Sequence, residues 1–117
     1  MSNLRERLEK RANPETVLTI DGERFLVVGL SRSERARQFA KCRDKAGKVN
    51  TERIEGEMLC LCVRDPDTRE QVFTDWSAWD NLPAQITGPL MAEIMQINGM
   101  DKDDVGREVK NSDATSN

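Results

Sequence analysis

The sequence contains no histidine and no tyrosine, and aromatic residues make up only 4% of its 117 residues. Without histidine there is no Ser–His or Cys–His pair to activate a nucleophile, and the most common side-chain ligand of transition metals is missing. No apolar run approaches the roughly 18 residues needed to cross a membrane, and the N-terminus lacks the apolar segment of a secretory signal. We therefore expect a soluble, intracellular protein that is not an enzyme, with no catalytic residue, no metal ligand and no cofactor.

Cysteine is scarce and forms no metal-binding motif. Cys42, Cys60 and Cys62 include no Cys-x-x-Cys pair, and the last two lie in the apolar run 58–63. The seven glycines are scattered and match no phosphate-binding loop. The sequence predicts that the thiols are buried, free and act as small hydrophobic groups in a reducing compartment.

Charged residues, in contrast, make up 33% of the chain, with a formal net charge of −3. Residues 1–53 hold 13 of the 18 basic and 8 of the 21 acidic side chains, a net +5, which leaves 5 and 13, a net −8, for residues 54–117. This asymmetry favours attraction of an oppositely charged partner, including another copy of the chain, although charges also cluster by chance on solvated faces.

The order of expected elements predicts an α+β fold, an N-terminal β-hairpin followed by a small, mainly helical bundle. Residues 16–20 and 23–28 are rich in β-branched and aromatic side chains and flank Asp21-Gly22, a favoured two-residue hairpin turn. Helices are expected over residues 3–12, 33–46, 51–64, a short stretch after Asp75, and 84–98. We expect one domain over residues 1–109, with 1–13 as a candidate mobile segment, and a disordered polar tail over 110–117.

Turn residues set the expected boundaries of these elements. Gly47 is expected to end helix 33–46, and Gly99, followed by Met100, to end helix 84–98. Gly56 weakens helix 51–64 by roughly 1 kcal/mol relative to alanine. The buried face of that helix is expected to hold Ile54, Met58, Leu61 and Cys62.

A basic stripe is the first candidate binding site. Arg37, Lys41, Lys45 and Lys48 recur at spacings of 4, 4 and 3, which places them along one side of a helix. They could form a solvated face, contact nucleic-acid phosphates, or bind an acidic protein surface. The acidic net charge disfavours nucleic acid.

The second candidate is an aromatic cluster. Phe73, Trp76 and Trp79 hold most of the aromatic area of the chain within a few residues of Leu82. They are either core residues, which is the default, or a protein-binding hot spot, where Trp is enriched.

Short motifs in order along the chain resemble the small tail assembly chaperones of long-tailed (siphovirus, lambda-like) bacteriophages. The resemblance covers roughly residues 15–112. Its motifs are Asp65-Pro66-Asp67-Thr68, Val72-Phe73-Thr74-Asp75, Trp79-x-x-Leu82-Pro83-Ala84, Ile94-x-x-Ile97-Asn98-Gly99-Met100 and Val109-Lys110-Asn111-Ser112. Members of that family often have glycine after the acidic pair, where this chain has Thr68-Arg69.

The resemblance implies a non-enzymatic chaperone in the host cell cytoplasm that is absent from the mature virion. Such a protein binds and solubilises the tape measure protein and helps tail tube subunits assemble around it, and many exist also in a longer, frameshifted form. The charge asymmetry suggests head-to-tail homo-oligomers, because an interface that does not close gives a spiral or filament. The alternative is a small nucleic-acid-binding regulator that uses the basic helix 33–48.

Overall fold

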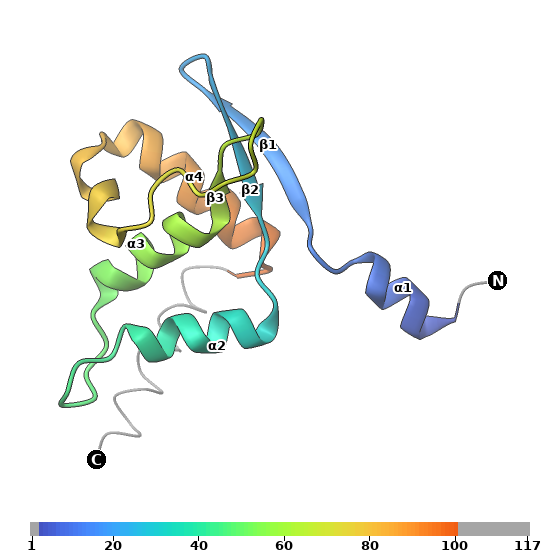
Figure 1. Cartoon of the computed structure of the whole chain (residues 1–117), viewed down its shortest axis with the longest axis horizontal. Coiled ribbons are helices and arrows are strands. Elements are labelled where there is room, and N and C mark those ends of the chain that lie inside the picture. Colours follow the sequence, from blue (N-terminus) through green and yellow to red (C-terminus); the bar gives the residue numbers. More distant parts are fainter. Residues whose placement is uncertain (1–2, 101–117) are drawn as a thin grey trace.

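The structure, a computed structural model, describes residues 3–100 and has the predicted α+β architecture (Figure 1). A β-hairpin and a short third strand form one sheet, and helices follow it along the chain. The elements are α1 (Leu4–Lys10), β1 (Glu15–Ile20), β2 (Glu23–Val28), α2 (Arg32–Lys41), α3 (Thr51–Cys62), β3 (Val63–Arg64), the 3₁₀ helix η1 (Trp76–Asn81) and α4 (Ala84–Ile97). The end of the predicted domain, residues 101–109, and the predicted tail, residues 110–117, lie outside the described residues.

The hairpin forms where the sequence predicts it. β1 pairs antiparallel with β2, and Ile20 faces Glu23 across the turn. Asp21 and Gly22 have φ values of 51° and 81°, so both turn residues adopt the left-handed conformation that matches the twist of the two strands. The local sequence alone is therefore sufficient to set this register.

The third strand corrects the predicted end of the helix 51–64. α3 ends at Cys62, and Val63 pairs with Val27 as β3 joins β2 in the sheet order β1-β2-β3. Asp65 precedes Pro66, which disfavours helical backbone there, and β-branched Val63 suits a strand. The chain leaves the helix to complete the sheet, which keeps β1 at one edge.

α3 lies at the centre of the molecule and packs against α2, α4, η1 and the sheet. The predicted core residues Ile54, Met58 and Cys62 are buried, whereas Leu61 is only half-buried. Leu59 and Cys60 are buried as well, because α3 is covered on more than one side rather than on the single face expected. All three cysteines are free and buried, as predicted.

Gly56 permits the closest contact of α3 with η1. A Cβ atom at this position would lie 2.7 Å from the carbonyl oxygen of Trp76, well inside van der Waals contact. The glycine that weakens the isolated helix thus allows the two helices to approach each other.

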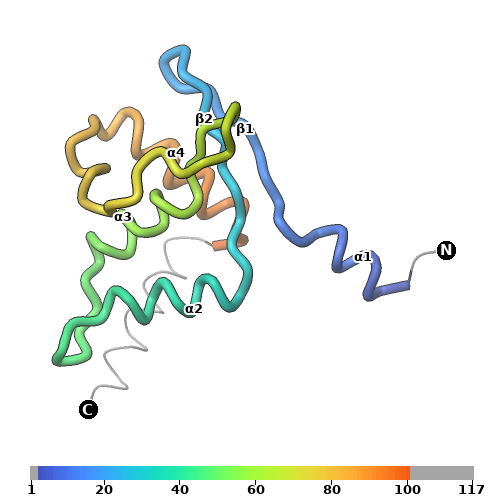
Figure 2. Tube along the Cα trace, in the orientation of Figure 1, coloured from blue at the N-terminus to red at the C-terminus, as the bar shows by residue number. Residues whose placement is uncertain are grey.

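The basic helix begins one residue earlier than expected and ends several residues earlier. Ser31, not Ser33, caps it: Ser31 Oγ accepts from the Glu34 N–H, and Glu34 Oε1 accepts from the Ser31 N–H. The helix ends at Lys41 rather than near residue 46, since the Cys42 carbonyl accepts a hydrogen bond from Asn50 N–H and Arg43 pairs with Val49. Gly47, with φ 84°, turns the tight loop that follows instead of ending the helix, and Figure 2 shows the path of this loop.

α4 ends as predicted. The N–H of Met100 donates to the Met95 carbonyl at 2.7 Å, that of Gly99 donates to Gln96, and Gly99 has φ 65°. These are the two bonds of a Schellman motif. Met100 is buried, so the end of the described chain is attached to the core.

α1 lies away from the rest of the molecule, beyond β1 (Figure 1). Asn3 caps it by accepting from the Glu6 N–H at 2.9 Å, but no residue of α1 is buried. We call α1 together with the start of β1 the N-terminal arm.

We expect Gly56→Ala to destabilise the protein by about 1–3 kcal/mol, although alanine favours helix, because the added methyl group displaces Trp76. Urea denaturation followed by circular dichroism measures the change. Glu55→Ala, at the neighbouring exposed position of α3, serves as the control and should shift stability by less than about 0.5 kcal/mol. Equal stability of the two variants would show that η1 does not depend on the glycine.

Candidate functional site

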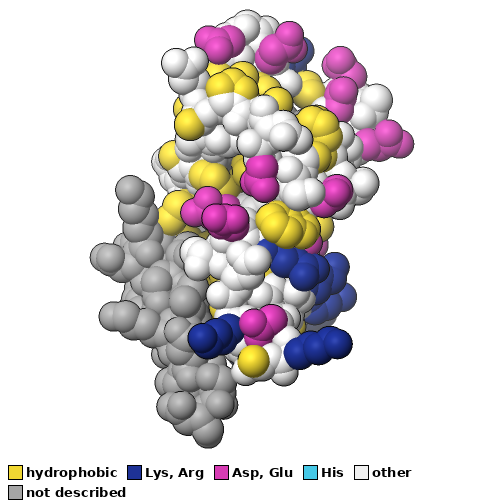
Figure 3. All heavy atoms as spheres, turned by 90° about the vertical axis from the view of Figure 1, so that its left-hand side faces the viewer, with side chains coloured by type: hydrophobic (Ala, Val, Ile, Leu, Met, Phe, Trp, Pro, Cys, Tyr) yellow, Lys and Arg dark blue, Asp and Glu magenta, His cyan; other side chains and the backbone are white. Residues whose placement is uncertain are grey.

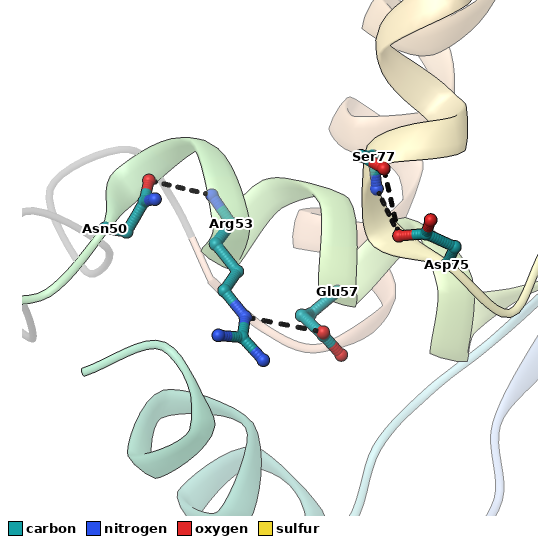
Figure 4. A network of polar contacts seen from close by, with 5 residues as sticks. All are labelled: Asn50, Arg53, Glu57, Asp75 and Ser77. Carbon is teal, nitrogen blue, oxygen red and sulfur yellow. Dashed lines mark hydrogen bonds and ion pairs between the residues drawn. The ribbon is translucent and has the colours of Figure 1, made fainter. Parts of the chain in front are cut away.

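The aromatic cluster is divided between core and surface. Trp79 is 2% exposed and packs edge-to-face with Phe73, with ring centroids 4.9 Å apart, whereas Phe73 and Trp76 are half-buried. Asp75 fixes η1 by accepting bonds from the N–H and hydroxyl of Ser77 at 3.1 and 3.0 Å (Figure 4). Trp79 is thus part of the core, and only Phe73 and Trp76 keep ring surface that a partner can contact.

The buried thiols are poor nucleophiles. Burial raises the pKa of Cys60 to about 11 and that of Cys62 to about 12, with Trp79 and Asn98 respectively opposing the rise as hydrogen-bond donors. Burial also raises the pKa of Cys42. The indole N–H of Trp79 itself has no partner that meets strict hydrogen-bond geometry, so its contact with Cys60 is weak. Reactive cysteines need a lowered pKa and access, and these three have neither.

Within residues 3–100, no group of three or more Cys, Asp or Glu side chains could hold a metal ion. In the same part of the chain, no helix is long and apolar enough to cross a membrane.

A salt bridge of 3.6 Å joins Arg53 and Glu57 on α3 (Figure 4), longer than a hydrogen bond. The two residues lie one turn apart on the same helix, so their pairing has a structural role.

The predicted basic stripe is not one helical line. Arg37 and Lys41 are exposed on α2, but Lys45 and Lys48 are exposed in the loop after it. We call these four residues the basic surface. Figure 3 shows Lys and Arg side chains at one end of the visible face and Asp and Glu side chains toward the other.

Exposed acidic side chains lie on the hairpin and in the turn after β3. They are Asp21, Glu23, Asp65, Asp67 and Glu70. The hairpin turn lies at the opposite end of the molecule from α2 and its loop (Figure 1). The carboxylates of the hairpin turn and the basic surface therefore lie at opposite ends of the molecule.

A second face of α2 borders a groove that the sequence analysis missed. Its open volume is about 470 Å³, and we call it the α2 groove. It is lined by Leu30, Arg32, Arg35, Ala36, Phe39, Arg43 and Asn98. Asn98 Oδ1 accepts from the Leu30 N–H at 2.7 Å, a bond that joins two lining residues 68 positions apart in the sequence. The spacing of residues 32, 35, 36, 39 and 43, which places them on one side of a helix, was the one signal in the sequence for this groove.

The N-terminal arm carries a further surface that was not predicted. Leu4 and Leu8 are 62% and 57% exposed, and Val17 on the edge strand β1 is 48% exposed. The two leucines are four residues apart and so share one face of α1. Side chains of this kind are usually covered by a partner when they occur together.

Comparison with known proteins gives no match: no family model, no curated protein and no solved structure matches the chain.

We expect the three thiols of the folded protein to resist a disulfide reagent such as DTNB near pH 8, and to react fully in denaturant. Because folding raises their pKa values, their contribution to stability is complete below about pH 8.5 and is lost as the pH rises through the folded-state values. Fast labelling of the native protein would contradict the burial.

Proposed function

We propose that this protein is a tail assembly chaperone of a long-tailed bacteriophage. It binds the tape measure protein, keeps it soluble and helps tail tube subunits assemble around it, in the host cell cytoplasm and not in the mature virion. The resemblance in sequence motifs supports this proposal. Two of those motifs have structural roles here: Trp79 of η1 fills the core, and Asn98-Gly99-Met100 ends α4.

The observation that carries the proposal is the N-terminal arm. α1 buries none of its residues, yet it holds Leu4 and Leu8 on one face, close along the chain to Val17 on β1. Burying an exposed leucine contributes about 1.5–3 kcal/mol. A helical, hydrophobic client offers an apolar surface that can cover this face. An amphipathic helix such as α1 binds by laying its apolar face in a groove of its partner.

Charge gives the proposal its second part, the association of copies along the client. The basic surface of one copy attracts the acidic end of the next, and such a head-to-tail interface extends without closing. Exposed charge pairs are screened by salt.

We therefore expect oligomers in sedimentation at low ionic strength that dissociate near 1 M salt. For Arg37→Glu/Lys41→Glu we expect monomers at every salt concentration. Salt-independent monomers of the unaltered chain would rule out this association.

Co-expression with the tape measure protein encoded in the same phage genome tests the function. We expect the unaltered chain to keep the tape measure protein in the soluble fraction, and Leu4→Ser/Leu8→Ser to lower that fraction at least about tenfold, because two apolar contacts are lost. Both positions are exposed, so the fold is retained. Lys10→Ser, an exposed change elsewhere on α1, is the control. A tape measure protein that precipitates with the unaltered chain would refute the proposal.

A further inference from the structure

The outer edge of β1 is an unpaired strand edge. Within residues 3–100, β1 pairs with β2 alone, and no further strand or bridge adjoins its other side. The opposite edge of the sheet is closed, because β3 is only two residues long and Arg64 bridges to Gln71. α1 lies beyond the start of β1 and not along it (Figure 1). The backbone of β1 is therefore open to another strand.

The pairing within the hairpin determines which backbone groups of β1 point outward. Just before the strand, the Gly29 N–H donates to the Pro14 carbonyl at 2.8 Å. Hydrogen-bonded pairs recur at every second residue of an antiparallel ladder, so the even-numbered residues of β1 bond to β2. Glu15, Val17 and Thr19 consequently direct their N–H and C=O groups toward the open edge.

Edge strands usually carry features that prevent further pairing, such as lysine, proline or a bulge. β1 contains no lysine and no proline, and its register with β2 is unbroken. Its one charged residue, Glu15, is paired with Arg69 of the turn after β3. Val17 is 48% exposed, so the strand combines open backbone groups with an exposed β-branched side chain, which favours strand pairing.

We propose that the β1 edges of two copies pair antiparallel around a two-fold axis at Val17. In this register Val17 faces Val17 of the second copy, and Glu15 faces Thr19 of the second copy. Each such pair exchanges two backbone hydrogen bonds. A shift along the strand in either direction leaves an outward residue of β1 without a partner in the strand, so this register uses the edge most completely.

Charge at the two ends of β1 favours a second copy as the occupant. Lys10 and Arg11 precede the strand, Asp21 and Glu23 follow it, and all four are exposed. An antiparallel second copy brings the basic end of each β1 beside the acidic end of the other. A parallel copy would bring like charges together, which is unfavourable.

The contact is small, and we expect it to be weak. One strand with its charged ends covers less than the roughly 1,200 Å² of a stable interface, so we expect a Kd of about 0.1–1 mM. At about 10 µM, where sedimentation is measured, this edge stays unpaired. The contact goes beyond the proposed function and does not depend on it. It forms wherever two copies reach a millimolar effective concentration.

Nuclear magnetic resonance of the full-length Arg37→Glu/Lys41→Glu chain, in which the basic surface is reversed, tests the pairing separately from charge-driven association. Between about 20 µM and about 1 mM, we expect the amide signals of Glu15, Val17 and Thr19 to shift with concentration. The amide signals of α3 and α4 should stay unchanged.

The register is tested by nuclear Overhauser effects in a mixture of labelled and unlabelled chains. Thr16 and Leu18 of the second copy form a non-hydrogen-bonded pair in the proposed register, where the two backbones approach most closely. We therefore expect an intermolecular effect between the Hα atoms of these two residues.

Val17→Lys tests the edge itself. Two lysines then face each other across the two-fold axis, and like charges directly opposite are destabilising, so we expect the Kd to rise at least about tenfold. Val17 is exposed, so the fold is retained. Val72→Lys, the same substitution at a 41% exposed valine outside β1, is the matched control and should leave the Kd unchanged.

Three results would overturn the proposal. The first is the absence of concentration-dependent shifts in β1 up to about 1 mM. The second is an unchanged Kd in Val17→Lys, which would place the contact on another surface. The third is an intermolecular effect that joins Thr16 to a residue other than Leu18, which would show a different register.

Discussion

The contact between Gly56 of α3 and Trp76 of η1 determines how this small protein builds a core. It allows the backbone of η1 to lie directly on α3, which brings Trp79 onto the same helix beside Cys60. Phe73 then closes over the Trp79 ring at its edge. With few aromatic residues in the chain, one tryptophan must fill much of the interior, and it can do so only where no Cβ separates the two helices.

Because the core is built on α3 alone, several parts of the chain remain outside it. α3 is covered by α2, α4, η1 and the sheet, and nothing in the described part of the chain covers α1. The apolar arm therefore lies away from the core, whereas the basic surface and the α2 groove lie on and around α2, which packs against α3. A protein of this design has surfaces for partners rather than an enclosed site, in agreement with the proposed chaperone role.

Local signals in the sequence predicted the features that local chemistry controls. Asp21-Gly22 specified the hairpin and Gly99 the end of α4, because each needs only a positive φ angle and neighbouring bonds. The early end of α2 and the strand β3 were missed because they depend on pairings with Asn50 and Val27, which lie elsewhere in the chain. The groove was missed for the same reason: Leu30 and Asn98 meet only in the folded protein. Of the two alternatives stated for the aromatic cluster, the structure selects the core for Trp79. The partners of the basic surface stay predictions.

The turn after β3 holds a non-glycine residue in the left-handed conformation. Arg69 has φ 65°, a left-handed conformation that glycine adopts more easily and that costs other residues roughly 1–2 kcal/mol. Its guanidinium group pairs with Glu15 of β1, and this contact lowers the pKa of Glu15. The arginine thus ties the turn to the edge strand, a contact that glycine cannot make.

Hydrogen exchange of the free protein tests the central claim, that one core built on α3 leaves the N-terminal arm independent. We expect the slowest exchange in α3 and β2, at a rate set by global unfolding, and exchange close to that of an unstructured peptide in α1. Protection of α1 as strong as that of α3 in the monomeric chain would contradict it.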